Sequence, residues 1–76
     1  MKVTIAKVHE NIFSGEAISL TAPTTEGVVT ILAKHEPFVA TLKSGTVIVR
    51  TTEGEQSFPT EDGVLEVSGN QATVLL

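Results

Sequence analysis

The stretch VLEVSGNQATVLL, residues 64–76, decides the fold class of this 76-residue chain. Two apolar runs, residues 64–67 and 72–76, flank the short polar segment Ser68-Gly69-Asn70. Glycine and asparagine tolerate the positive backbone φ angles that tight turns require. The pattern therefore predicts a β-hairpin at this end of the sequence.

The rest of the chain has the same β character. Val, Ile and Thr supply 26 of the 76 residues, and these β-branched side chains suit a pleated surface better than a helix. Six Gly and three Pro interrupt the chain often enough to leave little room for a stable helix. We expect strands at residues 3–8, 17–22, 28–32, 38–42, 46–51, 55–58, 64–67 and 71–75.

The expected fold class is all-β, as an antiparallel β-sandwich or flattened barrel of about 8–10 short strands. Each connector, such as APTTEG at residues 22–27, is only a few residues long, which favours antiparallel neighbours. No internal repeat or linker is visible, so residues 1–76 form a single β-sandwich domain.

Composition argues against several classes of function. The net charge is −4, and the five basic residues form no run that could follow a phosphate backbone. With three Phe, no Tyr and no Trp, the chain has little to stack on bases, so we expect no nucleic-acid partner. There is no cysteine to form a disulfide, and no apolar run reaches the length of a signal peptide or membrane span.

Enzymatic and metal sites are also poorly supported. The sequence has no glycine-rich phosphate loop and no dinucleotide fingerprint, and nothing places a serine near either histidine, so we assign no catalytic residue. His9–Glu10 and His35–Glu36 each put a histidine beside an acid, but neither has a second histidine at ligand spacing. We interpret both as surface pairs and assign no metal site.

The segment AKHEP, residues 33–37, has two interpretations that stay open at this point. Pro37 fixes its own φ and biases Glu36 toward an extended conformation, which gives the loop a defined shape. A rigid loop on a rigid sheet suits recognition, because little conformational entropy is left to lose on binding. The same residues would also suit a tight corner between sheets.

Taken in order along the chain, a set of short motifs resembles the N-terminal β-sandwich domain of the epsilon subunit of F-type ATP synthases, whose mitochondrial counterpart is called delta. The resemblance covers nearly the whole chain. The matching motifs are Phe13-Ser14-Gly15, Glu26-Gly27, Ile31-Leu32, His35-Glu36-Pro37, Leu42-Lys43-Ser44-Gly45, Asp62-Gly63-Val64-Leu65-Glu66-Val67 and Ala72-Thr73-Val74-Leu75.

The resemblance implies a non-catalytic rotor part in the central stalk. Such a domain lies between the gamma subunit and the ring of c subunits and couples them for proton- or sodium-driven ATP synthesis. It implies a peripheral position on the cytoplasmic face of a bacterial-type cell membrane, reached only through the complex. The loop containing Lys34, His35 and Pro37, with the turn Glu26-Gly27 beside it, would face the c-ring, and Ala40 would face gamma.

Departures from the family pattern affect these same positions. Ala33-Lys34 replaces the usual Pro-Gly before the histidine, and Val28 stands where an acidic residue is common. The sequence contains no counterpart of the family's C-terminal helical hairpin, which binds ATP in some members. We therefore expect no cofactor, no direct nucleotide binding and no self-inhibition. The alternative function is a free-standing β-sandwich that binds a peptide or small ligand by its sheet edge.

Overall fold

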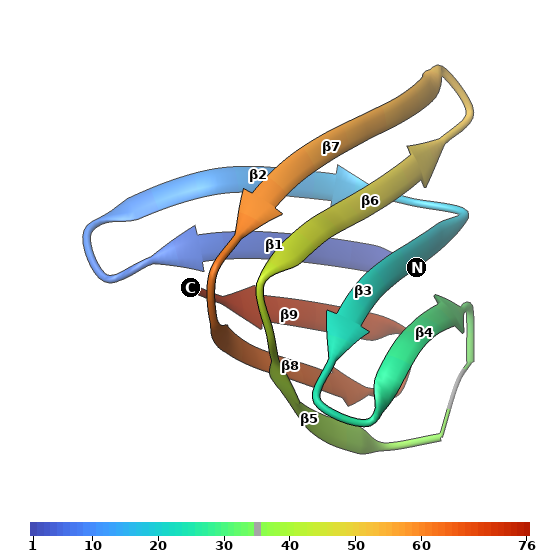
Figure 1. Ribbon diagram of the computed structural model, residues 1–76. Helices are drawn as coiled ribbons and strands as arrows, with labels where there is room; N and C mark the ends of the chain where they lie inside the picture. Colours follow the sequence, from blue (N-terminus) through green and yellow to red (C-terminus); the bar gives the residue numbers. More distant parts are fainter. Residues whose placement is uncertain (35) are drawn as a thin grey trace.

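The computed structural model describes residues 1–34 and 36–76, and in these residues short β-strands follow one another with brief turns between them (Figure 1). The described part of the chain contains no helix. It therefore also contains none that is long and apolar enough to cross a membrane. The strands are β1 Lys2–Lys7, β2 Glu10–Glu16, β3 Ser19–Thr24, β4 Gly27–Leu32, β5 Phe38–Leu42, β6 Gly45–Thr51, β7 Gly54–Thr60, β8 Gly63–Ser68 and β9 Gln71–Leu75.

One continuous sheet contains all of these strands, in the order β2-β1-β9-β8-β5-β3-β6-β7, and β4 pairs with β3 outside that path. The sheet curls so that its β6-β3-β4 half faces its β1-β9-β8 half, which gives the two layers of a β-sandwich (Figure 1). The expected all-β sandwich or flattened barrel is confirmed. One neighbouring pair, β1 with β9, is parallel, whereas the expectation was purely antiparallel.

The core lies between the two layers and follows the period of two expected for strands with one buried face. In β1, for example, Val3 and Ile5 are fully buried, whereas the alternate residues are exposed (Lys2) or half-buried (Thr4 and Ala6). At about 25 cal/mol per Å² of apolar surface, burying these side chains is the main favourable term for the fold. The buried apolar residues are Val3, Ile5, Ala17, Leu20, Ala22, Ile31, Leu42, Val47, Val49, Leu65, Val67, Ala72 and Val74.

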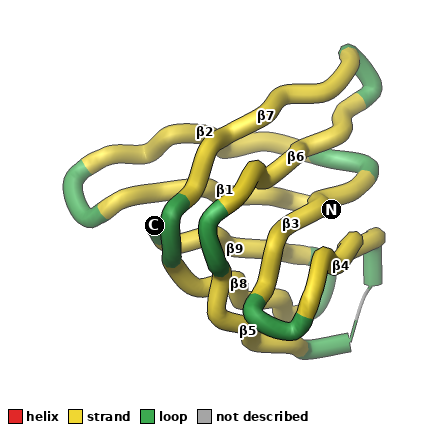
Figure 2. The backbone as a smooth tube through the Cα atoms, viewed as in Figure 1, coloured by secondary structure: helices red, strands yellow, loops and turns green. Residues whose placement is uncertain are grey.

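The two ends of the curled sheet, β2 and β7, are joined by side chains. Phe13 in β2 and Phe58 in β7 pack with ring centroids 5.7 Å apart and planes tilted by 60°. Tilted ring pairs at this separation are attractive beyond the area they bury. The smooth trace in Figure 2 shows the two strands approaching each other while most loops stay short. The aromatic pair therefore helps to hold the curl closed.

The hairpin predicted from residues 64–76 is confirmed. β8 and β9 pair from Val64↔Leu75 to Ser68↔Gln71, and Gly69 in the turn has a φ of 61°. Glycine adopts this left-handed conformation without strain, as the Ser-Gly-Asn segment led us to expect. The Ser68-Gly69-Asn70 turn therefore sets the register of the last two strands.

Two expectations about strands were wrong. The segment Glu10–Glu16 was not expected to form a strand, yet β2 pairs along the whole of β1. Its apolar residues do not alternate, because a β-bulge between Ile5 and Ala6 shifts the register at this point. The pattern of period two that reveals other strands is lost there.

The second error concerns Pro23, which was assigned to a turn and lies inside β3. It stands opposite Val28 of β4 in a non-hydrogen-bonded pair, next to the pair Thr24↔Gly27 that closes the turn, so its missing N–H removes no bond between β3 and β4. The Pro23 carbonyl points away from β4 and accepts a hydrogen bond from the Lys43 N–H at 3.0 Å. At this point the partner of β3 changes from β6 to β5.

Candidate functional site

The turn between β3 and β4 is a short, internally bonded unit. The Thr24 hydroxyl donates to the Gly27 carbonyl at 2.6 Å and accepts from the Glu26 N–H at 3.1 Å. Thr24 is buried, whereas Glu26 is exposed, and Gly27 has a φ of 119°, which an L-residue rarely adopts. The turn therefore presents the Glu26 carboxylate to solvent on a fixed backbone.

The loop between β4 and β5 has a strained backbone at Lys34. Its φ is 64°, the left-handed region, which costs a residue with a Cβ roughly 1–2 kcal/mol relative to glycine. This is the position at which the resembling family carries glycine. The Lys34 N–H donates to Asn70 Oδ1 at 3.3 Å, so the β8–β9 turn helps to hold this conformation.

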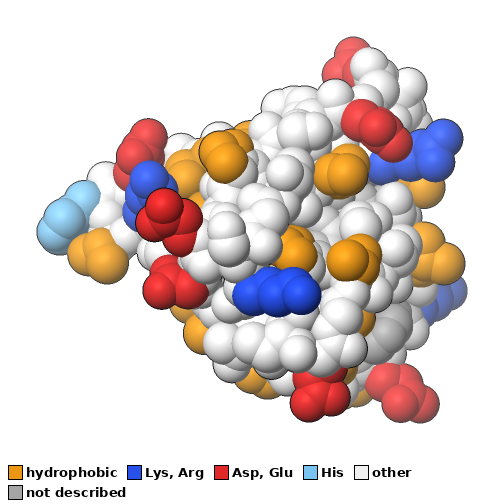
Figure 3. Space-filling model, viewed as in Figure 1, with side chains coloured by type: hydrophobic (Ala, Val, Ile, Leu, Met, Phe, Trp, Pro, Cys, Tyr) orange, Lys and Arg blue, Asp and Glu red, His pale blue; other side chains and the backbone are white. Residues whose placement is uncertain are grey.

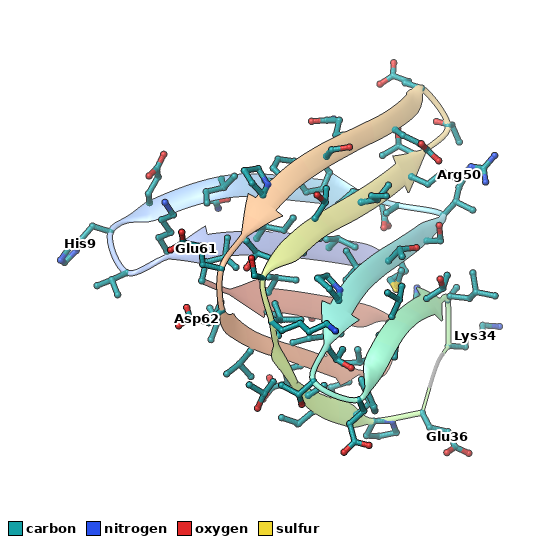
Figure 4. All side chains as sticks on the ribbon, viewed as in Figure 1. His9, Lys34, Glu36, Arg50, Glu61 and Asp62 are labelled. Carbon is teal, nitrogen blue, oxygen red and sulfur yellow. The ribbon has the colours of Figure 1, made fainter. Side chains whose placement is uncertain are left out.

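The described charged side chains of this loop, Lys34 and Glu36, point away from the body of the molecule (Figure 4). Lys34, Glu36 and Pro37 are all exposed, and Figure 4 shows Lys34 and Glu36 projecting from the same end of the structure. The interpretation of His35 as a contact residue lies outside the described residues. Ala40 is in β5, half-buried, opposite Leu65 of β8.

The structure separates two segments that the sequence analysis placed side by side. The Glu26-Gly27 turn precedes β4 and the loop with Lys34 follows it, so the full length of β4 lies between them. At about 3.3 Å per residue the two ends of this six-residue strand are roughly 17 Å apart along the chain. A surface that includes both segments must therefore run along β4.

A shallow cavity of about 360 Å³ connects two of the expected contact residues. It lies between the β3–β4 turn, β4 and β5, and Glu26 and Ala40 both line it. Its other lining residues are Thr24, Thr25, Val29, Phe38, Val39 and Thr41. The expected c-ring turn and the expected gamma strand thus adjoin one cavity.

A second cavity, of about 370 Å³, lies beside Lys7, Glu61 and Asp62. Figure 4 shows Glu61 and Asp62 on the side of the molecule opposite Lys34 and Glu36, near the hairpin that carries His9. Within residues 1–34 and 36–76, no three His, Cys, Asp or Glu side chains gather closely enough to hold a metal ion. None of the expected contact residues adjoins this cavity.

Sequence reasoning missed two residues that shape these turns. Thr24 was assigned to a polar connector, yet its buried hydroxyl makes two of the hydrogen bonds that define the Glu26 turn. Asn70 was assigned only to the β8–β9 hairpin, and its amide also accepts from the Lys34 backbone. A threonine two residues before a glutamate is a recognisable side-chain turn signal. The contact of Asn70 joins residues 36 apart and has no local signal.

The fold is a small β-sandwich domain, and the expected contact residues Glu26, Lys34 and Pro37 lie on turns at the rim of its sheet. The family model of the ATP synthase delta/epsilon chain β-sandwich domain matches residues 1–76. The chain belongs to this family.

Individual relatives agree with this assignment. The ATP synthase epsilon chain of Chlorobium limicola is 41% identical over 75 residues, a match that covers 97% of this chain and 85% of the relative. The epsilon chain of Bordetella avium is 40% identical over 76 residues, and there the chain spans 54% of the relative's length. A solved structure of the mitochondrial ATP synthase of Euglena gracilis, with its F1 part and c-ring, contains a chain with a TM-score of 0.88 and 25% identity. That match covers 96% of this chain and 48% of the other.

Proposed function

We propose that this chain is a non-catalytic part of the central stalk of an F-type ATP synthase, where it joins the gamma subunit to the c-ring. The observation that carries the proposal is the match of the family's β-sandwich domain to all of residues 1–76. Relatives of similar sequence are ATP synthase epsilon chains, and the Euglena structure with the same fold includes the F1 part and the c-ring.

The physical role of such a part is to transmit torque, which requires a stiff body with two contact surfaces. The described chain supplies stiffness through a close-packed core between two sheet layers. The contact surfaces are assigned to turns and edges of that body: Glu26, Gly27, Lys34, His35 and Pro37 toward the c-ring, and Ala40 toward gamma. Coupling would serve proton- or sodium-driven ATP synthesis.

In this role the chain reaches the membrane only through the complex. The proposed position is peripheral, at the cytoplasmic face of a bacterial-type cell membrane, and the named relatives from Chlorobium and Bordetella are bacterial. The domain would bind no nucleotide and no cofactor of its own. Calorimetric titration of the chain with ATP checks this, because saturable binding at micromolar concentration would contradict it.

The contact assignment is tested by assembly with a purified c-ring–gamma complex. Lys34→Glu and His35→Ala should leave the melting temperature nearly unchanged and weaken association. Reversing one exposed charge at the edge of an interface should cost about 1 kcal/mol, or about fivefold in affinity, at low salt.

Matched controls lie at the other end of the molecule. Lys7→Glu makes the same change of charge and His9→Ala removes the other imidazole, and both residues are exposed. Figure 4 shows His9 at the tip of the projecting β1–β2 hairpin, far from Lys34. Association weakened equally by the controls, or unchanged in all four variants, would remove the loop from the contact surface.

A further inference from the structure

The outer edge of β4 differs from the other free strand edges of the described sheet. β2 has a β-bulge and a glutamate at each end, and β7 has Glu55 and Pro59. Bulges, charges and proline are the usual devices that prevent an exposed edge from pairing with another chain. β4, with the sequence GVVTIL, has none of these devices. Its outer edge is therefore able to pair with a further strand.

The register shows which backbone groups this edge offers. Thr24 and Gly27 close the two-residue turn before β4, so hydrogen-bonded pairs alternate with non-hydrogen-bonded pairs from there along β3 and β4. Pro23, which has no N–H to donate, stands opposite Val28 and agrees with this alternation. Every second residue of β4 thus turns its N–H and C=O groups away from β3. These residues are Val28, Thr30 and Leu32.

The side chains of the same three residues form an exposed stripe on the outer face of the sheet. Val28 is 70% exposed and Leu32 is 56% exposed, with the exposed Thr30 between them. On the face shown in Figure 3, most acidic and basic side chains lie near the outline of the molecule. The edge strand therefore presents uncharged, largely apolar side chains to solvent.

This edge is complementary to a second copy of itself. Two β4 strands that pair antiparallel about a two-fold axis at Thr30 place Val28 of each copy opposite Leu32 of the other. The outward N–H and C=O groups would then form about six main-chain hydrogen bonds between the copies. Apolar side chains that oppose each other across two strands add to the stability of the pair.

The charged residues beyond the two ends of β4 select this register and this occupant. Glu26 precedes β4 and Lys34 follows it, and both are exposed. Each is four residues from Thr30, so pairing about Thr30 brings Glu26 of each copy to the level of Lys34 of the other. Opposite charges then meet at both ends of the apolar stripe. Moving the axis by one residue in either direction places a charge opposite an apolar side chain instead.

We propose that the free chain forms a two-fold dimer in which the two β4 strands pair about Thr30 and join both copies in one continuous sheet. The contact is isologous, because each copy contributes the same residues. A single pair of strands is a small interface, so the dimer is weak and forms at high concentration. The inference goes beyond the proposed function and does not depend on it. Because Glu26 and Lys34 are also proposed to face the c-ring, the dimer is a state of the chain outside the complex.

Sedimentation equilibrium of the chain from about 10 μM to about 1 mM tests the dimer. The average mass should rise from the 8.0 kDa of one chain toward twice that value. Glu26→Lys and Lys34→Glu each bring like charges together at both ends of the interface, so each should weaken dimerisation about tenfold. The double variant, which carries both changes, restores opposite charges and should dimerise as the original chain does.

Matched controls make the same changes of charge elsewhere on the surface. Glu61→Lys and Lys7→Glu alter exposed residues outside β4 and its two flanking turns, and neither should change the dimerisation constant by more than about twofold. A mass that stays at 8.0 kDa over the whole range would overturn the inference. A double variant as weak as the single variants would also overturn it, because the two charges would then not face each other.

A disulfide reports the register directly, because the chain contains no cysteine of its own. The Cα atoms of a hydrogen-bonded antiparallel pair lie about 5.5 Å apart, a separation that a disulfide spans. Thr30→Cys, on the two-fold axis, should therefore cross-link to a covalent dimer under mild oxidation. Ser57→Cys, exposed on the free edge of β7, should not. Equal rates of cross-linking for the two variants would indicate random collision and would overturn the pairing of β4 with β4.

Discussion

Gly63 is the residue at which the largest effect of a single methyl group is expected. It opens β8, pairs with Leu42 of β5, and has a φ of 146°. A Cβ at this position would overlap the Leu75 carbonyl oxygen and lie 3.2 Å from Leu76 Cδ2. Because the carbonyl belongs to the backbone of β9, the neighbouring strand itself would have to shift.

Gly54, in the β6–β7 hairpin, supplies a matched control. Its φ is 121°, and a Cβ there would meet nothing within 4 Å. Both Gly→Ala variants force an L-residue to a positive φ, at a cost of about 1–2 kcal/mol. Gly63→Ala adds the clash with β9, which overpacking data place at about 1–3 kcal/mol. The expected losses are therefore about 2–5 kcal/mol for Gly63→Ala and about 1–2 kcal/mol for Gly54→Ala.

Urea denaturation followed by circular dichroism measures both losses. A domain of this size has a total stability of about 4–11 kcal/mol, so Gly63→Ala should lose a large share of it. In a domain this small, 1 kcal/mol corresponds to roughly 4–8 °C in melting temperature. Equal losses for the two variants would refute the reasoning. They would show that the positive φ alone sets the loss of stability and that β9 can shift without a cost in free energy.

Three further predictions follow from the described contacts. Lys34→Gly should stabilise the chain by about 0.5–1 kcal/mol, because relief of the left-handed strain exceeds the added chain entropy; Lys34→Ala should show no such gain in the same melting experiment. Phe58→Ala should cost about 2 kcal/mol in urea denaturation through loss of its ring contact with Phe13, and a loss below about 0.5 kcal/mol would show that the curl closes without it. Leu65→Ala, at a fully buried site, should cost about 2–5 kcal/mol of unfolding free energy. A smaller loss would mean that neighbouring side chains move into the space left by the removed atoms.

Local patterns in the sequence predicted the parts of the fold that local physics controls. The β8–β9 hairpin followed from the Ser-Gly-Asn turn between two apolar runs, and Gly69 adopts the expected left-handed conformation. Strands with one buried face were visible from their period of two. β2 was missed because its register shifts at a bulge, so its apolar residues Ile12 and Phe13 are adjacent rather than alternate.

Features that depend on contacts between residues far apart in the chain could not be predicted from the sequence. The parallel pairing of β1 with β9 joins the two ends of the sequence, and no local signal marks it. The change of partner along β3 makes room for Pro23 inside a strand, a place where proline normally argues against one. The positive φ of Lys34 is a left-handed conformation that a lysine gives no reason to expect, and it was not predicted.

The candidate contact residues show the same division. Exposure of Glu26, Lys34 and Pro37 followed from their places in turns, and the structure confirms that each is exposed. Their relative positions did not follow, since the turn and the loop lie at opposite ends of β4. The groove between β4 and β5 depends on which strand pairs with β3, and that is decided by the packing of the whole sheet.

The central claim is that this domain is held between gamma and the c-ring. The most direct measurement is affinity purification of the chain from the native membranes of cells that express it, with quantification of every co-purifying protein. The claim predicts that gamma and c subunits are recovered in constant proportion to the chain and are lost together when the complex is dissociated. Recovery of the folded chain without gamma or c subunits would contradict it.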